Sequence, residues 1–169
     1  MAGSPKVAAG LEEMGQMARV RMLFSKRGPF CFIRHVDLPQ IFSRSARRAD
    51  LEIEQTEGFS PHPKISLGPA LPVGVVACAE PGEIWFSRWE EGYLSRFNSF
   101  LPDGLAISAA EEVDGKALNK LCEAAEYVLR PQDPSKMDLI AMSLDSEGLL
   151  EGSVYRWSVD SGLLNLVMG

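Results

Sequence analysis

Both histidines of the chain stand in segments whose residue types could do chemistry. His62 lies in residues 58–66, where one proline precedes it, another follows it, and both restrict the backbone. His35 lies in residues 34–37, just ahead of an arginine-rich stretch. An imidazole forms directional hydrogen bonds, and its charge changes near neutral pH. The two segments together predict a working surface for ligand binding or for acid–base chemistry.

The arginine-rich stretch is predicted to form an amphipathic helix from Asp37 to Ala49. Apolar residues recur at the spacing of one buried helical stripe. Asp37 is a typical N-cap, and Gln40 three residues later completes a capping-box pattern. Neighbouring like charges on the opposite face repel one another, so a bound anion would relieve them, whereas a solvated face is the alternative. That face carries Arg44, Arg47 and Arg48.

The two segments and the helix define a candidate set for binding a phosphate-bearing substrate. Cationic side chains would meet phosphates, and the histidines would supply directional hydrogen bonds. Lys26 and Arg27, in a predicted turn, are further candidates for phosphate contact. The substrate-binding set is Arg34, His35, Arg44, Arg47, Arg48, His62 and Lys64.

The residue types leave alternatives open at three positions. His35 precedes a helix N-terminus, whose dipole disfavours the protonated ring, so it either faces a ligand uncharged or is buried against a backbone carbonyl. His62 would share one side of a strand with Lys64, so its loop either contacts a ligand or is purely structural. Phe59 is predicted to anchor the loop in the core rather than to stack on a base.

Charge is unevenly distributed along the 169 residues. The net charge is −6, but residues 1–64 hold 10 Lys/Arg against 7 Asp/Glu (+3), and residues 65–169 hold 7 against 16 (−9). A polyanion would therefore meet the N-terminal half through local contacts. No apolar run approaches the roughly 20 residues of a membrane helix, and no signal-like apolar stretch is seen near the N-terminus. We expect a cytoplasmic protein without a membrane partner.

Several classes of chemistry lack support in the sequence. Cys31, Cys78 and Cys122 lie far apart, and no CxxC or HExxH motif is present, so we expect no metal and no cofactor. No glycine-rich phosphate loop and no convincing pair of acid–base carboxylates occurs. These observations favour a non-enzymatic protein, with no catalytic residue assigned.

The order of predicted elements favours an α+β fold. Strand–helix–strand occurs twice over residues 19–112, which is the split βαβ pattern of a ferredoxin-like sandwich. The connection of residues 57–81 is a long inserted loop, and long ordered loops are often functional. We predict strands near residues 19–24, 51–55, 65–67, 83–87 and 105–109, and helices over residues 37–49 and 90–101.

The pattern also predicts how the chain is divided. Residues 1–17 are expected to be disordered or foreign to the natural protein. Residues 18–113 would form the ferredoxin-like core. Residues 114–169 would be a C-terminal extension packed on the same sheet, with a strand at 125–129, a helix at 134–144 and a hairpin around residues 160–162.

The motifs of the N-terminal two thirds resemble a bacterial domain family linked to radical S-adenosylmethionine proteins. The resemblance covers roughly residues 20–112 and fades beyond them. Arg34 and Ser60 depart from the family pattern, which usually has serine and asparagine there. The residues that carry the resemblance are Phe24-Ser25-Lys26-Arg27-Gly28-Pro29, Phe32-Ile33-Arg34-His35-Val36-Asp37-Leu38, Ala46-Arg47-Arg48-Ala49, Gly58-Phe59-Ser60-Pro61-His62-Pro63-Lys64-Ile65-Ser66 and Leu71-Pro72-Val73-Gly74.

The resemblance implies partnership with a radical S-adenosylmethionine enzyme. Our first hypothesis is a non-catalytic accessory module that recognises RNA, or another phosphate-bearing substrate, through the basic helix and the Pro-His-Pro loop. The second is a small nuclease that uses His35 and His62 as general acid and base. The third is a protein-interaction domain that docks on the radical enzyme through an exposed apolar patch including Phe59, Leu71 and Val73.

Overall fold

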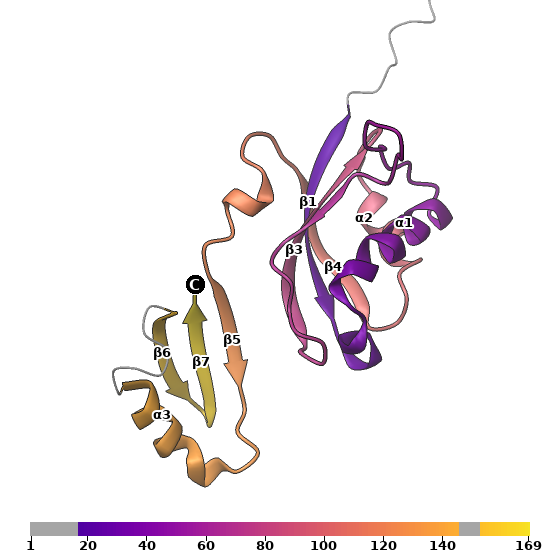
Figure 1. Cartoon of the computed structure of the whole chain (residues 1–169). Coiled ribbons are helices and arrows are strands. Elements are labelled where there is room, and N and C mark those ends of the chain that lie inside the picture. The colour runs from indigo at the N-terminus through magenta and orange to yellow at the C-terminus, as the bar shows by residue number, and fades with distance from the viewer. Residues whose placement is uncertain (1–16, 146–152) are drawn as a thin grey trace, which may run out of the picture. The chain divides into compact units, whose positions relative to one another are not determined.

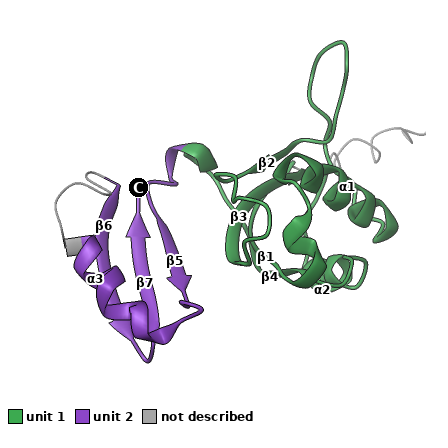
Figure 2. Cartoon of the chain, turned by 60° about the horizontal axis from the view of Figure 1, so that its bottom comes forward, with its two compact units in different colours: residues 1–119 green, residues 120–169 purple. Residues whose placement is uncertain are grey.

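The computed structural model describes residues 17–145 and 153–169 (Figure 1). The chain divides into two compact units, Met1–Asn119 and Lys120–Gly169, coloured separately in Figure 2. The expectation of disorder falls almost wholly on residues 1–16, which lie outside the described residues.

The first unit is built on a four-stranded antiparallel sheet with the order β2-β3-β1-β4. Both helices lie on one face of this sheet (Figure 1). Each βαβ pair is split by a strand inserted between its two members, which is the ferredoxin-like topology, so the expected α+β class is confirmed. The elements are β1 (Ala18–Lys26), α1 (Leu38–Arg48), β2 (Ile65–Leu67), β3 (Ala77–Phe86), α2 (Tyr93–Asn98) and β4 (Leu105–Glu112), with 3₁₀ turns η1 (Gly28–Phe32), η2 (His35–Asp37) and η3 (Leu118–Lys120).

The core lies between the sheet and the two helices. Along β1, Val20, Met22 and Phe24 are buried in strict alternation, as the period of two in a strand requires. Phe42 from α1 has no exposed surface and lies edge-to-face against Phe24. Phe97 from α2 contacts Phe42 in the same way. An aromatic cluster therefore joins the sheet to both helices.

The segment after α1 differs from the expected strand at 51–55. It forms only isolated bridges, from Ile53 to Phe86 and from Gln55 to Pro63. It folds back on residues 62–64 as a small hairpin, and the second strand of the sheet is β2. The strand predicted at 51–55 is therefore wrong, because a short alternating segment does not reveal whether it finds a continuous pairing partner.

Two other element boundaries also differ from expectation. β3 begins at Ala77, earlier than predicted, because the chain pairs with β1 from Ala77 onward. α2 spans Tyr93–Asn98, which is shorter than the helix predicted over residues 90–101.

The predicted capping box at the start of α1 is wrong. The side chain of Asp37 makes no capping hydrogen bond, and its backbone is already helical (φ −89°, ψ −17°). The reason is that η2 runs directly into α1, so no extended capping residue exists. The Asp37 carboxylate instead accepts hydrogen bonds from Nε and Nη2 of Arg34, at 2.9 and 3.1 Å.

The second unit forms a sheet of its own, with the order β5-β7-β6. Among the described residues its strands pair only with one another, and the packing of residues 114–169 on the sheet of the core stays a prediction. The predicted hairpin is present, with Ser161 and Gly162 at its turn. The elements are β5 (Ala125–Leu129), η4 (Pro134–Lys136), α3 (Met137–Asp145), β6 (Val154–Asp160) and β7 (Leu163–Met168).

The first compact unit extends beyond β4 to Asn119. Residues after β4 remain attached to the first unit, because Arg19 binds both Gly115 and Lys116 through their carbonyls, at 3.1 and 2.9 Å. In addition, the N–H of Val113 donates to the carbonyl of Arg19. In the part of the chain that the structure describes, no helix is long and apolar enough to cross a bilayer.

Candidate functional site

His62 lies on a hairpin that projects from the sheet, which we call the hairpin arm (residues 53–64). The N–H of Thr56 donates to the carbonyl of His62 (2.8 Å), and the N–H of His62 donates to the Thr56 hydroxyl (3.2 Å). That hydroxyl also shares a hydrogen bond of 3.0 Å with Nδ1 of His62. The ring is thus oriented by Thr56, and Nε2 is left without a partner among the described residues. His62 has both a structural contact and a nitrogen available to a ligand.

The tip of the arm presents an aromatic ring to solvent. Gly58 has φ +125°, a conformation that suits glycine alone, and it turns the chain there. Phe59, the next residue, is completely exposed. The prediction that Phe59 anchors the loop in the core is therefore wrong.

Lys64 lies at the base of the arm. Its backbone N–H donates to the carbonyl of Glu54 (2.7 Å), and Nζ lies 5.0 Å from the centroid of the Trp85 ring. A cation over the face of an indole is attracted by the ring quadrupole. The ammonium of Lys64 is thereby held beside the arm on the face of the sheet opposite the helices.

The predicted arginine face of α1 is exposed. Its three arginines take part in no ion pair within residues 17–145 and 153–169, while the opposite side of α1 is buried in the core. The arm follows α1 after a short connection. The N–H of Leu51 donates to the carbonyl of Ala46 at the end of the helix, and residues 52–54 then form hydrogen bonds with residues 85–87. Arg96 of α2 adds a cation at this end through a 3.0 Å bond to the carbonyl of Asp50. The three arginines are Arg44, Arg47 and Arg48.

Arg34 and His35 lie elsewhere, near the C-terminal end of β1. Arg34 is exposed but forms a bidentate ion pair with Asp37. His35 is half-buried, and its pKa is lowered first by burial and then by the charge of Lys26. An uncharged His35 at neutral pH fits the sequence expectation. Arg34, in contrast, is already neutralised by its neighbour.

Lys26 is not available to a surface phosphate, contrary to our expectation. It is only 3% exposed, and its Nζ donates one long hydrogen bond of 3.4 Å to the carbonyl of Ile33. Its inward position continues the alternation of β1, a signal that sequence reasoning could have used. Arg27, the next residue, is exposed.

Glu80 is a titratable residue that sequence reasoning missed. It pairs in register with Phe24, so both side chains lie on the helix-facing side of the sheet. Burial raises the pKa of Glu80, and the charge of Lys26 partly offsets this effect. Lys26, His35 and Glu80 thus form one electrostatic cluster, brought together by β-sheet register and by η2.

The structure does not bring the two histidines together. The arm leaves the sheet beside Trp85, which pairs with Arg19, whereas His35 lies near Lys26. The strand from Arg19 to Lys26 spans about 23 Å at roughly 3.3 Å per residue. This separation gives no support to a mechanism in which both imidazoles act on one phosphodiester.

The expected apolar patch is also divided. Phe59 belongs to the hairpin arm. Val73 lies in a loop at the Lys26 end of β1, where the Gly74 N–H donates a 2.8 Å hydrogen bond to the carbonyl of Cys31. Phe32 lies beside that loop and is 69% exposed. The larger exposed apolar surface is therefore at the Lys26 end. Its members are Phe32, Val36, Val73 and Val76.

Replacing Glu80 with glutamine is expected to raise the midpoint of thermal unfolding at pH 7. Because the pKa of Glu80 is raised, its ionised form weakens the folded state above the ordinary carboxyl pKa. The gain should be no more than about 1 kcal/mol, since the side chain is half exposed and screened. It should shrink as the pH falls through 4.5 and vanish well below that pH, where the carboxyl is protonated in both states. Calorimetry at both pH values tests this, with Glu57→Gln on the exposed arm as the control.

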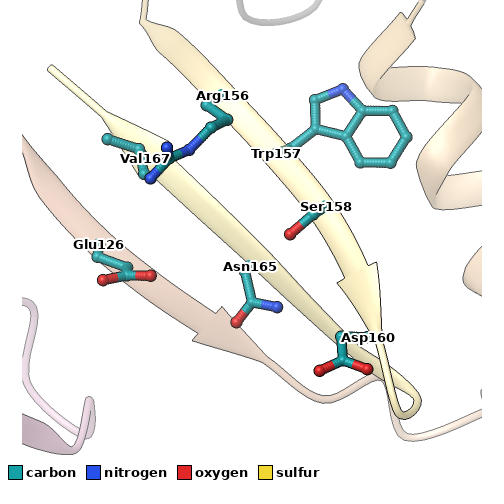
Figure 3. Close-up of a pocket in the computed structure, with 7 residues that line it drawn as sticks. All are labelled: Glu126, Arg156, Trp157, Ser158, Asp160, Asn165 and Val167. Carbon is teal, nitrogen blue, oxygen red and sulfur yellow. The ribbon is translucent and has the colours of Figure 1, made fainter.

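The second unit carries a separate polar pocket of about 280 Å³ on one face of its sheet (Figure 3). Cross-strand register puts Glu126, Val167 and Arg156 side by side, with Asn165 beside Ser158. The ring of Trp157 points away from these side chains, toward a helix (Figure 3). The pocket contains none of the residues predicted from the sequence.

The described residues contain no group of three or more His, Cys, Asp or Glu side chains arranged to hold a metal ion. Of the three cysteines, Cys31 is buried and donates to the carbonyl of Lys26, Cys78 is exposed, and Cys122 is half-buried.

The fold and the site define a ferredoxin-like α+β protein with an exposed basic helix and a projecting hairpin arm. Residues 19–151 match a family described as uncharacterized protein conserved in bacteria (DUF2344). The chain belongs to this bacterial family. No curated protein matches it.

Proposed function

We propose that the chain is a non-catalytic accessory module that recognises RNA, or another phosphate-bearing substrate, for a radical S-adenosylmethionine enzyme. The partner enzyme is implied by the motifs quoted above, which resemble those of domains linked to such enzymes. The substrate class is argued from the exposed charges of the first unit.

The observation that carries the proposal is the exposed, unpaired state of Arg44, Arg47 and Arg48. Other arginines of the first unit are engaged: Arg21 binds Glu83, and Arg34 binds Asp37. The α1 arginines have no such partner among the described residues. Guanidinium groups suit phosphate because their planar donors match its oxygens.

The hairpin arm adds two further candidates for phosphate contact. It begins a few residues after α1 and carries the free Nε2 of His62 and, two residues later, Lys64, whose ammonium lies over the Trp85 ring on the sheet face opposite the helices. An imidazole nitrogen can hydrogen-bond a phosphate oxygen or a 2′-hydroxyl. Binding is local, because the whole chain carries a net charge of −6.

The test is fluorescence anisotropy with bulk tRNA and a short single-stranded RNA at 50 and 200 mM salt. We expect binding that weakens steeply with salt, and a loss of about tenfold or more for Arg44→Glu/Arg47→Glu. The salt slope is the slope of the logarithm of the binding constant against the logarithm of the salt concentration. For the single strand, removing two phosphate contacts should reduce its magnitude by about 1.4. The control is Arg130→Glu/Lys136→Glu, which changes the net charge equally at two exposed positions in the second unit.

Absence of binding at 50 mM salt would contradict the proposal, as would equal losses from the two double variants. A second candidate would then gain weight, namely a protein-interaction domain that docks on the radical enzyme. The observation that favours it is the exposed apolar surface of Phe32, Val36, Val73 and Val76 at the Lys26 end.

A further inference from the structure

Phe59 is completely exposed, whereas Phe32 is 69% and Phe100 is 42% exposed. Phe24, Phe42, Phe86 and Phe97 are each at most 1% exposed, as expected of phenylalanine in a folded domain. Phe59 contributes nothing to the core. A large ring that the fold holds fully in water has no stabilising role within this unit, so its role lies in what it contacts from outside.

The ring is carried by a braced support. The three bonds between Thr56 and His62 close the arm just below the tip. Pro61 and Pro63 restrict the backbone on either side of His62. A ring presented on such a support loses little further entropy when a ligand binds it.

The neighbours of Phe59 favour a nucleic acid base over a protein pocket. Protein interfaces surround an aromatic anchor with further apolar side chains. Phe59 instead stands alone, because Glu57, Ser60 and His62 around it are polar and exposed. Lys64 lies at the base of the arm, and the α1 arginines precede the arm in the chain. A lone exposed ring on a segment flanked by cations suits a ligand that alternates flat bases with phosphates, as single strands do.

We infer that Phe59 is a base-stacking platform, so that the ligand of this surface is single-stranded RNA with at least one unpaired base. The inference rests on the proposed function and adds the strandedness of the ligand. Paired bases in an A-form duplex are not accessible to a side chain in this way, since sequence and stacking contacts require splayed bases. The α1 arginines bind the RNA phosphates, and Phe59 on the arm binds only a base that is unpaired.

The test compares a single-stranded 12-nucleotide RNA with a duplex of the same sequence, by anisotropy at fixed salt. We expect the single strand to bind more tightly than the duplex. Phe59→Ala should weaken single-strand binding by about 5- to 150-fold and leave the salt slope unchanged, because stacking involves no counterion. Phe59→Trp should restore binding, and Phe59→Leu should not. None of these variants removes a contact of the folded chain, since the ring is fully exposed.

Three outcomes would overturn the inference. If Phe59→Ala binds like the wild type while Arg44→Glu/Arg47→Glu does not, stacking is wrong and the proposed function stands. If the duplex binds as tightly as the single strand, the strandedness is wrong. If Phe59→Leu retains full binding, the ring contributes only apolar area. Absence of RNA binding by every form of the protein would overturn the inference and the proposed function together.

Discussion

Glu83→Gln is expected to lower the free energy of unfolding of the first unit by about 3 kcal/mol. Glu83 is completely buried, and its Oε1 accepts hydrogen bonds from Arg21 Nε and Nη2 at 3.1 and 2.7 Å. Arg19 Nη2 lies 3.7 Å from the same oxygen. Glutamine would leave two largely buried guanidinium groups without a counter-charge. Breaking a buried pair in this way costs far more than breaking an exposed one.

The loss should extend to the segment that follows β4. Arg19 and Arg21 also donate to the carbonyls of Gly115 and Lys116, on the face of the sheet opposite the helices. Their orientation depends on Glu83, whose Oε2 has no partner of its own. Hydrogen exchange of the amides around residues 113–116 should therefore speed up in the variant beyond the change in global stability.

Urea unfolding monitored by circular dichroism measures the main effect. The matched control is Asp37→Asn, which breaks the exposed bidentate pair with Arg34 and should cost less than about 1 kcal/mol. Equal costs for the two variants would show that the Glu83 cluster contributes no more than a surface ion pair.

Phe42→Ala is expected to lower the free energy of unfolding by about 3–5 kcal/mol. Phe42 has no exposed surface, and its ring lies 5.3 Å from that of Phe24 and 6.3 Å from that of Phe97, both edge-to-face. Alanine would leave a cavity at the point where α1, α2 and β1 meet. The edge-to-face contacts add about 0.5–1.5 kcal/mol each to the lost apolar burial.

Calorimetry or urea titration measures this effect, with Phe100→Ala as the control. Phe100 is 42% exposed, so its replacement should cost roughly 1 kcal/mol or less. A cost for Phe42→Ala as small as that of the control would mean that the core repacks around the cavity and that the aromatic cluster does not hold the helices to the sheet.

Sequence reasoning identified the features that depend on neighbours along the chain. The helical stripe of α1, the alternation of β1 and the turn at Ser161 follow from local periodicity and turn chemistry, and each is present. The exposed arginines of α1 follow from the same periodicity, because residues opposite a buried stripe must face solvent. The order of these elements was also sufficient to predict the ferredoxin-like core.

Features that depend on pairing across the chain could not be predicted in this way. Lys26 and Glu80 meet because β1 and β3 share a register, which no single segment specifies. The capping prediction failed because η2 runs directly into α1, and the Asp37 carboxylate pairs with Arg34 instead.

The sequence by itself determined the α+β class, the main helix and strands, and the exposed arginine face of α1, because hydrophobic period and residue type are local properties. The tertiary structure alone decided that His35 and His62 lie apart, that Phe59 is exposed on an arm, and that the C-terminal strands form their own sheet. The physical reason is that strand pairing and burial arise from contacts between segments distant in the chain, and many partners satisfy the same local pattern.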